Sequence, residues 1–139
     1  MRVVLDTNVL VAALRSRAGA SFQIVSMLPS PKFQIALSLP LYLEYRDVLL
    51  RPNVRPSNVA ESEIVDFIEN ILSNSETRDI HYLWRPTLKD QKDEMVLEVA
   101  VASRADYIIT FNVRDFGGLE LFGIEAIEPA KFLPLMRKL

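Results

Sequence analysis

The chain has 139 residues, half of them hydrophobic, and a formal net charge of −2. This length supports one domain with a sizeable core and is too short for two ordinary ones, so we expect a single domain over 1–139. The absence of cysteine excludes disulfides and thiolate chemistry, and the single histidine excludes a multi-histidine zinc centre. No apolar run reaches the ~20 residues that span a bilayer, and the first residues lack a signal-peptide pattern. We therefore expect a cytoplasmic protein with no membrane partner.

Hydrophobic periodicity and turn residues predict strands that alternate with helices. In chain order the sequence predicts a strand at 2–5, helices to about 14 and over 22–28, a strand at 33–37, helices over 40–50 and from 58 to about 72, a strand at 77–83, a helix at 91–104, strands at 107–110 and 124–127, and a helix at 131–139.

Several polar residues are expected to begin these helices. Ser21, Ser38 and Asp90 are suitable N-caps, and Asn58 followed by Glu61 resembles a capping box.

This alternation predicts an α/β fold in which helices cover both faces of a mostly parallel sheet. In such sheets the functional crevice lies beyond the carboxyl ends of the strands. Asp6 follows the first strand, while Asn112 and Asp115 follow the strand at 107–110, so all three are expected at that edge.

Asp6 is the first candidate for chemistry. With Thr7 and Asn8 it stands between a buried strand and an apolar helix. The carboxylate could cap the helix, or it could belong to a functional site at the strand end.

Glu44 is harder to explain as a surface residue. Leu41 and Val48 stand three residues before it and four after it, so its carboxylate shares an apolar stripe of the predicted helix. A buried carboxylate needs a cation, a hydrogen-bond set or a raised pKa.

Asp93 and Asp115 each have an ordinary structural explanation. Asp93 lies in the first turn of a predicted helix, where the helix dipole favours a negative charge. Asp115 could be a turn residue or a partner of Arg114.

The four acids point to metal chemistry if the fold gathers them. Converging carboxylates repel one another until a cation joins them, and oxygen ligands without histidine or cysteine select a hard ion such as Mg²⁺ or Mn²⁺. Such an ion can activate water for attack on a phosphodiester. The rest of the chain would then carry a small positive net charge. Six basic residues could face phosphates, or could be scattered solvated charges. They are Arg15, Arg17, Lys32, Arg46, Arg51 and Arg55.

The motifs together resemble the PIN domain family, and within it the compact VapC-like proteins classed as toxins of toxin–antitoxin pairs. The resemblance covers nearly the whole chain. It rests on Asp-Thr-Asn-Val-Leu at 6–10, Glu44 in an early helix, Asp-Gln-Lys-Asp at 90–93 before an Ala-rich helix, and the segment 105–116.

The resemblance implies a Rossmann-like α/β/α sandwich and a Mg²⁺- or Mn²⁺-dependent endoribonuclease. RNA would be the substrate, with an antitoxin protein and a second copy of the chain as partners. By motif, Asp6 and Asp93 would be direct metal ligands, Glu44 would bind the metal or its water, and Asp115 would complete the acidic pocket.

The resemblance also implies supporting residues. Asn8 and Thr110 would orient Asp6 and the acidic loop, and Asp90 would support the helix that carries Asp93. Asn112 departs from the family pattern, because many relatives carry an acid there. An amide can ligate a metal but supplies no charge, which leaves open a second metal site.

Two other functions fit part of the pattern. An aspartyl-phosphate phosphatase also places an aspartate after the first strand, but the dehalogenase type needs a second aspartate where this chain has Asn8. A non-catalytic RNA- or protein-binding PIN module would be consistent with Asn112.

The remaining distinctive side chains are expected to be structural. His81 and Trp84 are assigned structural roles. Core or dimer contacts are expected for Tyr42, Tyr45, Met95 and Phe116.

Overall fold

The structure, a computed structural model, describes residues 1–79 and 91–139. Its strands are β1 (Arg2–Leu5), β2 (Gln34–Leu37), β3 (Ser75–Thr77), β4 (Tyr107–Ile109) and β5 (Glu125–Ile127). Its α-helices are α1 (Thr7–Arg15), α2 (Ala20–Ser26), α3 (Leu39–Leu49), α4 (Glu61–Ser73), α5 (Gln91–Ser103) and α6 (Pro129–Lys138). Two short 3₁₀ turns, η1 (Val113–Asp115) and η2 (Leu119–Phe122), lie between β4 and β5.

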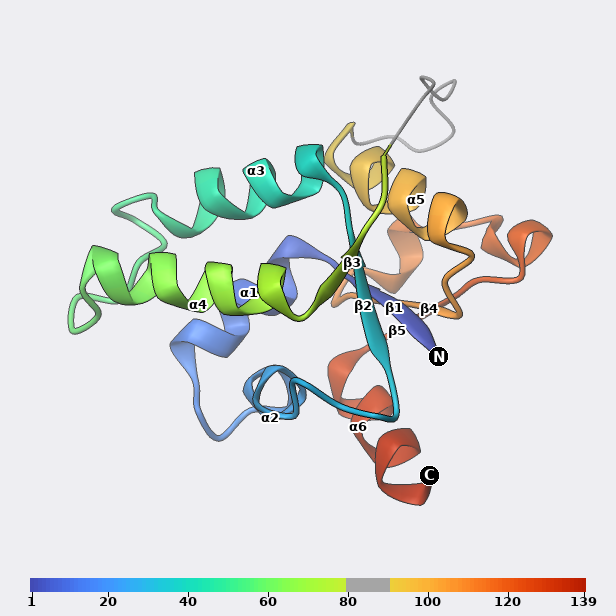
Figure 1. Ribbon diagram of the computed structural model, residues 1–139, viewed down its shortest axis with the longest axis horizontal. Coiled ribbons are helices and arrows are strands. Elements are labelled where there is room, and N and C mark those ends of the chain that lie inside the picture. The colour runs from blue at the N-terminus through green and yellow to red at the C-terminus, as the bar shows by residue number, and fades with distance from the viewer. Residues whose placement is uncertain (80–90) are drawn as a thin grey trace.

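The five strands form one sheet in the order β3-β2-β1-β4-β5, and every neighbouring pair is parallel (Figure 1). Strands β2 and β3 are added one after the other on one side of β1, and β4 and β5 are added on its other side. The order therefore reverses between β1 and β4. In open parallel sheets, such a reversal leaves a crevice beyond the carboxyl ends of the two strands.

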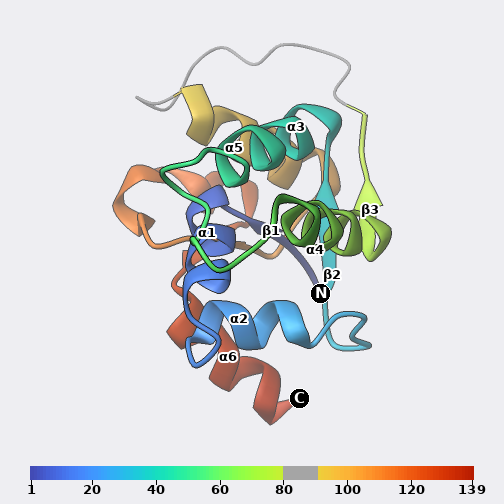
Figure 2. The same ribbon diagram turned by 90° about the vertical axis from the view of Figure 1, so that its left-hand side faces the viewer.

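Helices lie on both faces of the sheet. Figure 2 shows α3 and α5 on one side of the strands and α2 and α6 on the other, and α5 packs directly on β1, β2 and β4. Tyr45 and Phe132 are the largest fully buried side chains. The ring of Phe132 packs edge-on against Phe33, with the centroids 5.5 Å apart. The expectation of an α/β/α sandwich around a parallel sheet is confirmed.

Only one of the described helix caps matches its expectation. The Ser38 side chain accepts a 3.3 Å hydrogen bond from the N–H of Leu41 and Pro40 lies in the first turn, as predicted.

The cap at Ser21 was wrongly predicted. Helix α2 begins at Ala20 after Gly19, and Ser21 is buried inside its first turn. Ser21 shares the buried face of α2 with Ile24 and Val25, so its side chain packs inside the helix and does not cap it.

The capping box at Asn58 and Glu61 was also wrong. Helix α4 begins at Glu61 itself after Ala60, while Asn58 lies in an exposed turn. Glu61 instead lies 3.9 Å from Arg55 across the loop. The half-buried Val59 packs against the core, and its N–H donates a 3.1 Å hydrogen bond to the carbonyl oxygen of Pro56, so a separate turn precedes the helix.

Other differences concern element ends. Strand β3 covers Ser75–Thr77, so it begins before the predicted strand at 77–83, of which residues 80–83 lie outside the described residues. Helix α6 begins at Pro129, because proline fits the first turn of a helix. Asp90, His81 and Trp84 lie outside the described residues. Within 1–79 and 91–139, the helices are too short or too polar to cross a membrane.

Candidate metal centre

Asp6 lies at the end of β1, next to the point where the strand order reverses. Its backbone N–H donates a 2.9 Å hydrogen bond to the carbonyl oxygen of Ile109, so β1 and β4 stay paired up to this residue. Asp6 is the residue before α1, yet its side chain makes no capping hydrogen bond, and it is only 8% exposed. The helix-cap explanation is therefore wrong for its carboxylate.

The carboxylate of Asp6 is held from β4. The hydroxyl of Thr110 donates a 2.7 Å hydrogen bond to Asp6 Oδ2, and the backbone N–H of Asn112 donates a 2.9 Å bond to the same hydroxyl. Thr110 is fully buried. This chain of bonds fixes one oxygen of Asp6 and orients the turn that carries Asn112.

Tyr45 holds the same strand end from α3. Its fully buried hydroxyl donates a hydrogen bond to the carbonyl oxygen of Leu5, the residue before Asp6. Burial, and then the nearby charge of Asp6, raise the pKa of Tyr45 well above its ordinary value, so the hydroxyl remains a donor. Tyr45 follows Glu44 on α3 and Leu5 precedes Asp6, so this bond joins the helix that carries Glu44 to the strand that ends before Asp6.

A pocket of about 220 Å³ opens over this edge of the sheet. Three of the four predicted acids line it, Asp6 from β1, Glu44 from α3 and Asp93 from α5, together with the amides of Asn8 and Asn112. Asp93 is 8% exposed and lies in the first turn of α5, where backbone N–H groups favour a carboxylate. Glu44 is half-buried, as its apolar neighbours Leu41 and Val48 predicted.

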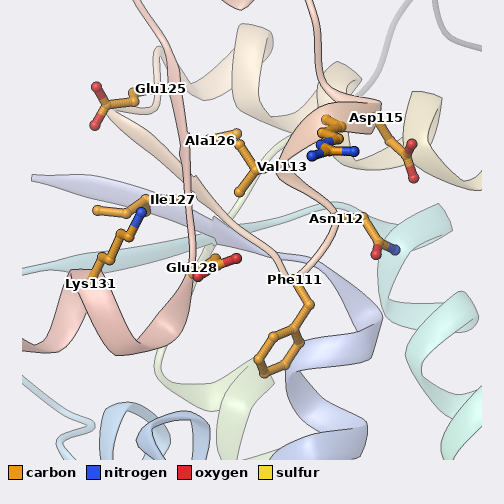
Figure 3. Close-up of a pocket in the computed structure, with 10 residues that line it drawn as sticks. Phe111, Asn112, Val113, Asp115, Glu125, Ala126, Ile127, Glu128 and Lys131 are labelled. Carbon is orange, nitrogen blue, oxygen red and sulfur yellow. The ribbon is translucent and has the colours of Figure 1, made fainter.

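Asp115 does not line this pocket. It is exposed in η1 and lines a second, larger pocket that shares Asn112 with the first. Figure 3 shows the side chains of Asn112 and Asp115 extending to the same side of the segment that joins them. Among the described residues, Asp115 makes no ion pair with Arg114. A role for Asp115 in the acidic site stays a prediction.

The donor set of the first pocket suits a hard cation. Carboxylate and amide oxygens are the ligands that Mg²⁺ and Mn²⁺ prefer. The buried Oδ1 of Asn8 has no hydrogen-bond partner, which leaves an oxygen available in the pocket wall. Within residues 1–79 and 91–139, however, no three acidic or histidine side chains are grouped as a metal-holding cluster. A bound cation would have to draw these carboxylates together against their mutual repulsion.

Arg51 is the only cation among the described residues that line the pocket. Its guanidinium donates a 2.6 Å bond to Asp47, one turn earlier, and both side chains are largely exposed. In the sequence, Arg51 was one of six bases that could face phosphates or be scattered charges, and its position beside the acids was not predicted. Tyr45 was predicted only as a core or dimer contact. In the sequence, the one indication of its hydrogen-bonding role was that Tyr45 carries a hydroxyl group and directly follows the candidate acid Glu44.

The basic residues of the first half do not form one patch of free charges. Arg46 pairs with Glu69, Arg51 with Asp47, and Arg55 with Glu61. Of these bases, Arg51, which follows α3, is the one that lines the pocket.

Comparisons with known proteins agree with this fold. A family model described as PIN domain matches residues 2–114. Among solved structures, a chain in the crystal structure of VapBC2 from Rickettsia felis bound to a DNA fragment from their promoter is similar, with a TM-score of 0.61 and 16% sequence identity. The match covers 92% of this chain and 100% of that chain, and at this identity it concerns the fold alone. No curated protein matches the sequence. Because the family model covers most of its length, the chain belongs to the PIN domain family.

Proposed function

We propose that this protein is an endoribonuclease that uses Mg²⁺ or Mn²⁺ to hydrolyse RNA phosphodiester bonds. The observation that carries the proposal is the pocket at the reversal of strand order. In it Asp6, Glu44 and Asp93 come from three different elements to one crevice. A crevice lined by three carboxylates offers the oxygen ligands that suit a divalent ion such as Mg²⁺.

Asp6 and Asp93 would hold the ion directly, and Glu44 would hold it or its water. The ion would supply Lewis-acid activation of a water and charge neutralisation at the cleaved phosphodiester. The chain's own residues do the positioning. Thr110 fixes one oxygen of Asp6, Tyr45 fixes the strand end, and the amides of Asn8 and Asn112 supply neutral oxygens at the rim.

Arg51 would contact a phosphate of the RNA. A guanidinium binds phosphate oxygens in pairs, and the ion pair with Asp47 is exposed enough to exchange for that contact. Because phosphate contacts do not read sequence, Arg51 would contribute to affinity for all RNAs.

We further propose that the protein is the toxin of a toxin–antitoxin pair and forms a homodimer in the cytoplasm. The VapC-like motifs and the likeness of the fold to a VapBC2 chain support this. Induced expression should arrest growth for the wild type and not for Asp6→Asn. Light scattering should give twice the mass of the 139-residue chain.

The direct test is cleavage of labelled single-stranded and structured RNAs with Mg²⁺, with Mn²⁺ and with EDTA. Asp6→Asn and Asp93→Asn should each reduce cleavage at least ~100-fold, since they remove ligand charges. Asp66→Asn is the matched control, because Asp66 is an exposed carboxylate on α4 away from the pocket. It should cleave like the wild type.

Other outcomes would contradict the proposal. Cleavage that is indifferent to EDTA, or equal in the Asp6 and Asp66 variants, would exclude the metal site. RNA binding without any cleavage would favour a non-catalytic module, which is the function that Asn112 suggests. A phosphate adduct on Asp6 would favour an aspartyl-phosphate enzyme.

A further inference from the structure

A second pocket lies beside the candidate metal centre. It has a volume of about 710 Å³ and is lined by residues of the segment after β4, of β5 and of the first turn of α6 (Figure 3). Asn112 lines both pockets, so the two adjoin at this residue, which follows β4. The metal proposal leaves this second pocket without a role.

The backbone fixes how the two pockets are related. The N–H of Thr110 donates a 2.9 Å bond to the carbonyl oxygen of Ile127. Phe111 and Glu128 therefore leave adjacent strands side by side, directly after the residue that holds Asp6. Strands β1 and β5 are two positions apart in the sheet, which corresponds to roughly 10 Å. This spacing brings the second pocket within reach of a nucleotide next to one bound at Asp6.

Phe111 gives the pocket an aromatic wall. Its side chain is 46% exposed and the neighbouring Val113 is 37% exposed, whereas the aliphatic residues of β4 just before them are buried. Large exposed apolar side chains at the mouth of a pocket mark a contact surface for a ligand. A nucleobase removed from its stack commonly packs against such a ring.

Glu128 and Lys131 give the same pocket two opposite charges. Glu128 is the residue before α6, but its side chain makes no capping hydrogen bond. Neither Glu128 nor Lys131 forms an ion pair with any of the described residues. Figure 3 shows Glu128 near the Phe111 end of the pocket and Glu125 at the far end. Glu128 and Lys131 thus add a carboxylate and an ammonium to the pocket that Phe111 also lines.

We propose that this pocket binds a guanine base of the RNA, an inference that rests on the proposed ribonuclease function. The Watson–Crick edge of guanine carries two adjacent donors, N1–H and the 2-amino group, beside the acceptor O6. The Glu128 carboxylate accepts from both donors, Lys131 donates to O6, and the base packs on Phe111. Adenine, cytosine and uracil lack the two adjacent donors. The excess of carboxylates also makes the pocket unsuited to phosphate.

Binding measurements in EDTA test the base pocket without relying on cleavage. The probes are fluorescent uridine-rich 12-mers that carry guanosine, adenosine, cytidine or inosine at one central position. The wild type should bind the guanosine RNA about tenfold more tightly than the adenosine, cytidine and all-uridine RNAs. Inosine lacks only the 2-amino group, so the inosine RNA should bind with intermediate affinity.

Variants assign the preference to the named residues. Glu128→Gln should bind the guanosine and inosine RNAs equally, and Phe111→Ala should bind every RNA about tenfold more weakly because stacking is lost. Glu120→Gln, an exposed carboxylate outside the pocket, should keep the wild-type preference. Circular dichroism should show the same fold for all variants.

Equal binding of all RNAs by the wild type, or an unchanged guanosine preference in Glu128→Gln, would overturn the inference. Guanosine preference in a protein that never cleaves RNA would support the base pocket and refute the nuclease. Metal-dependent cleavage with no base preference would support the nuclease and refute the base pocket.

Discussion

The hydroxyl of Thr110 donates a 2.7 Å hydrogen bond to the carboxylate of Asp6, 104 residues earlier in the chain. The bond joins the ends of β1 and β4, the two strands between which the strand order reverses. It makes the orientation of Asp6 depend on the fold of the second half of the chain.

Replacement of Thr110 by valine removes this bond and keeps the side-chain shape. Hydrogen-bond partners of metal ligands typically contribute ~10–100-fold to metal affinity or activity, and we expect a loss of that size in Mn²⁺ affinity. Isothermal titration with Mn²⁺ measures it. Thr77→Val, at an exposed position of β3, is the matched control, and an equal effect of the two changes would show that the Thr110 bond does not orient a ligand.

Tyr45→Phe removes the donor to the carbonyl oxygen of Leu5. A buried carbonyl left unsatisfied costs about 1–3 kcal/mol, so the free energy of unfolding should fall by that amount. Mn²⁺ affinity should fall as well, because the spacing of Glu44 and Asp6 loosens. Urea unfolding and Mn²⁺ titration measure the two effects, and a stability loss with unchanged affinity would give Tyr45 a packing role only.

The pKa of Tyr45 also predicts how stability depends on pH. Its folded pKa lies above the unfolded value of 10.0, so above that pH the unfolded chain releases a proton that the folded chain retains. The Tyr45 contribution to stability is therefore complete below pH 10 and is lost as the pH rises through the folded pKa. Urea unfolding from pH 8 to 11 should show a shallower alkaline decline for Tyr45→Phe than for the wild type. Parallel declines would contradict the assignment.

Arg51→Gln should raise KM for RNA about tenfold and leave kcat nearly unchanged, because the phosphate contact is made equally in the bound and transition states. The dependence of binding on salt should also become shallower by about one unit of slope. Steady-state kinetics at several salt concentrations measure both. Arg55→Gln removes a half-buried base that also pairs with an acid but lies outside the pocket, and it is the control. A loss confined to kcat would instead place Arg51 at the reacting atoms.

Asp115→Asn tests whether the metal site is confined to the smaller pocket. Because Asp115 lines only the larger one, this variant should bind Mn²⁺ like the wild type, whereas Asp93→Asn should bind at least ~10-fold more weakly. A loss of Mn²⁺ affinity in Asp115→Asn as large as that in Asp93→Asn would show that Asp115 belongs to the metal site, as its motif implied.

The sequence predicted the sheet and much of the site, because both depend on local patterns. The apolar runs at 2–5 and 107–110 identify central strands, and the acids after them fall at one edge by the geometry of parallel sheets. The half-buried position of Glu44 followed from Leu41 and Val48 alone.

The features that the sequence did not predict depend on contacts between distant segments. Ser21 is not a cap because α2 begins one residue before it and buries its side chain. Asp115 lies in η1 and lines the second pocket, and its role in the acidic site stays a prediction. The bond from Tyr45 to Leu5 depends on how α3 crosses β1, which no local pattern encodes. Arg51 reaches the pocket because it follows the last turn of α3, whose direction is set by packing against α4 and α5.

The central claim is that Asp6, Glu44 and Asp93 form a divalent metal site. The most direct measurement is an anomalous difference map from a crystal of the protein grown with Mn²⁺. The proposal predicts a peak between the carboxylates of Asp6 and Asp93 that disappears in Asp6→Asn. A pocket without a peak, with those carboxylates turned apart in saturating Mn²⁺, would contradict it.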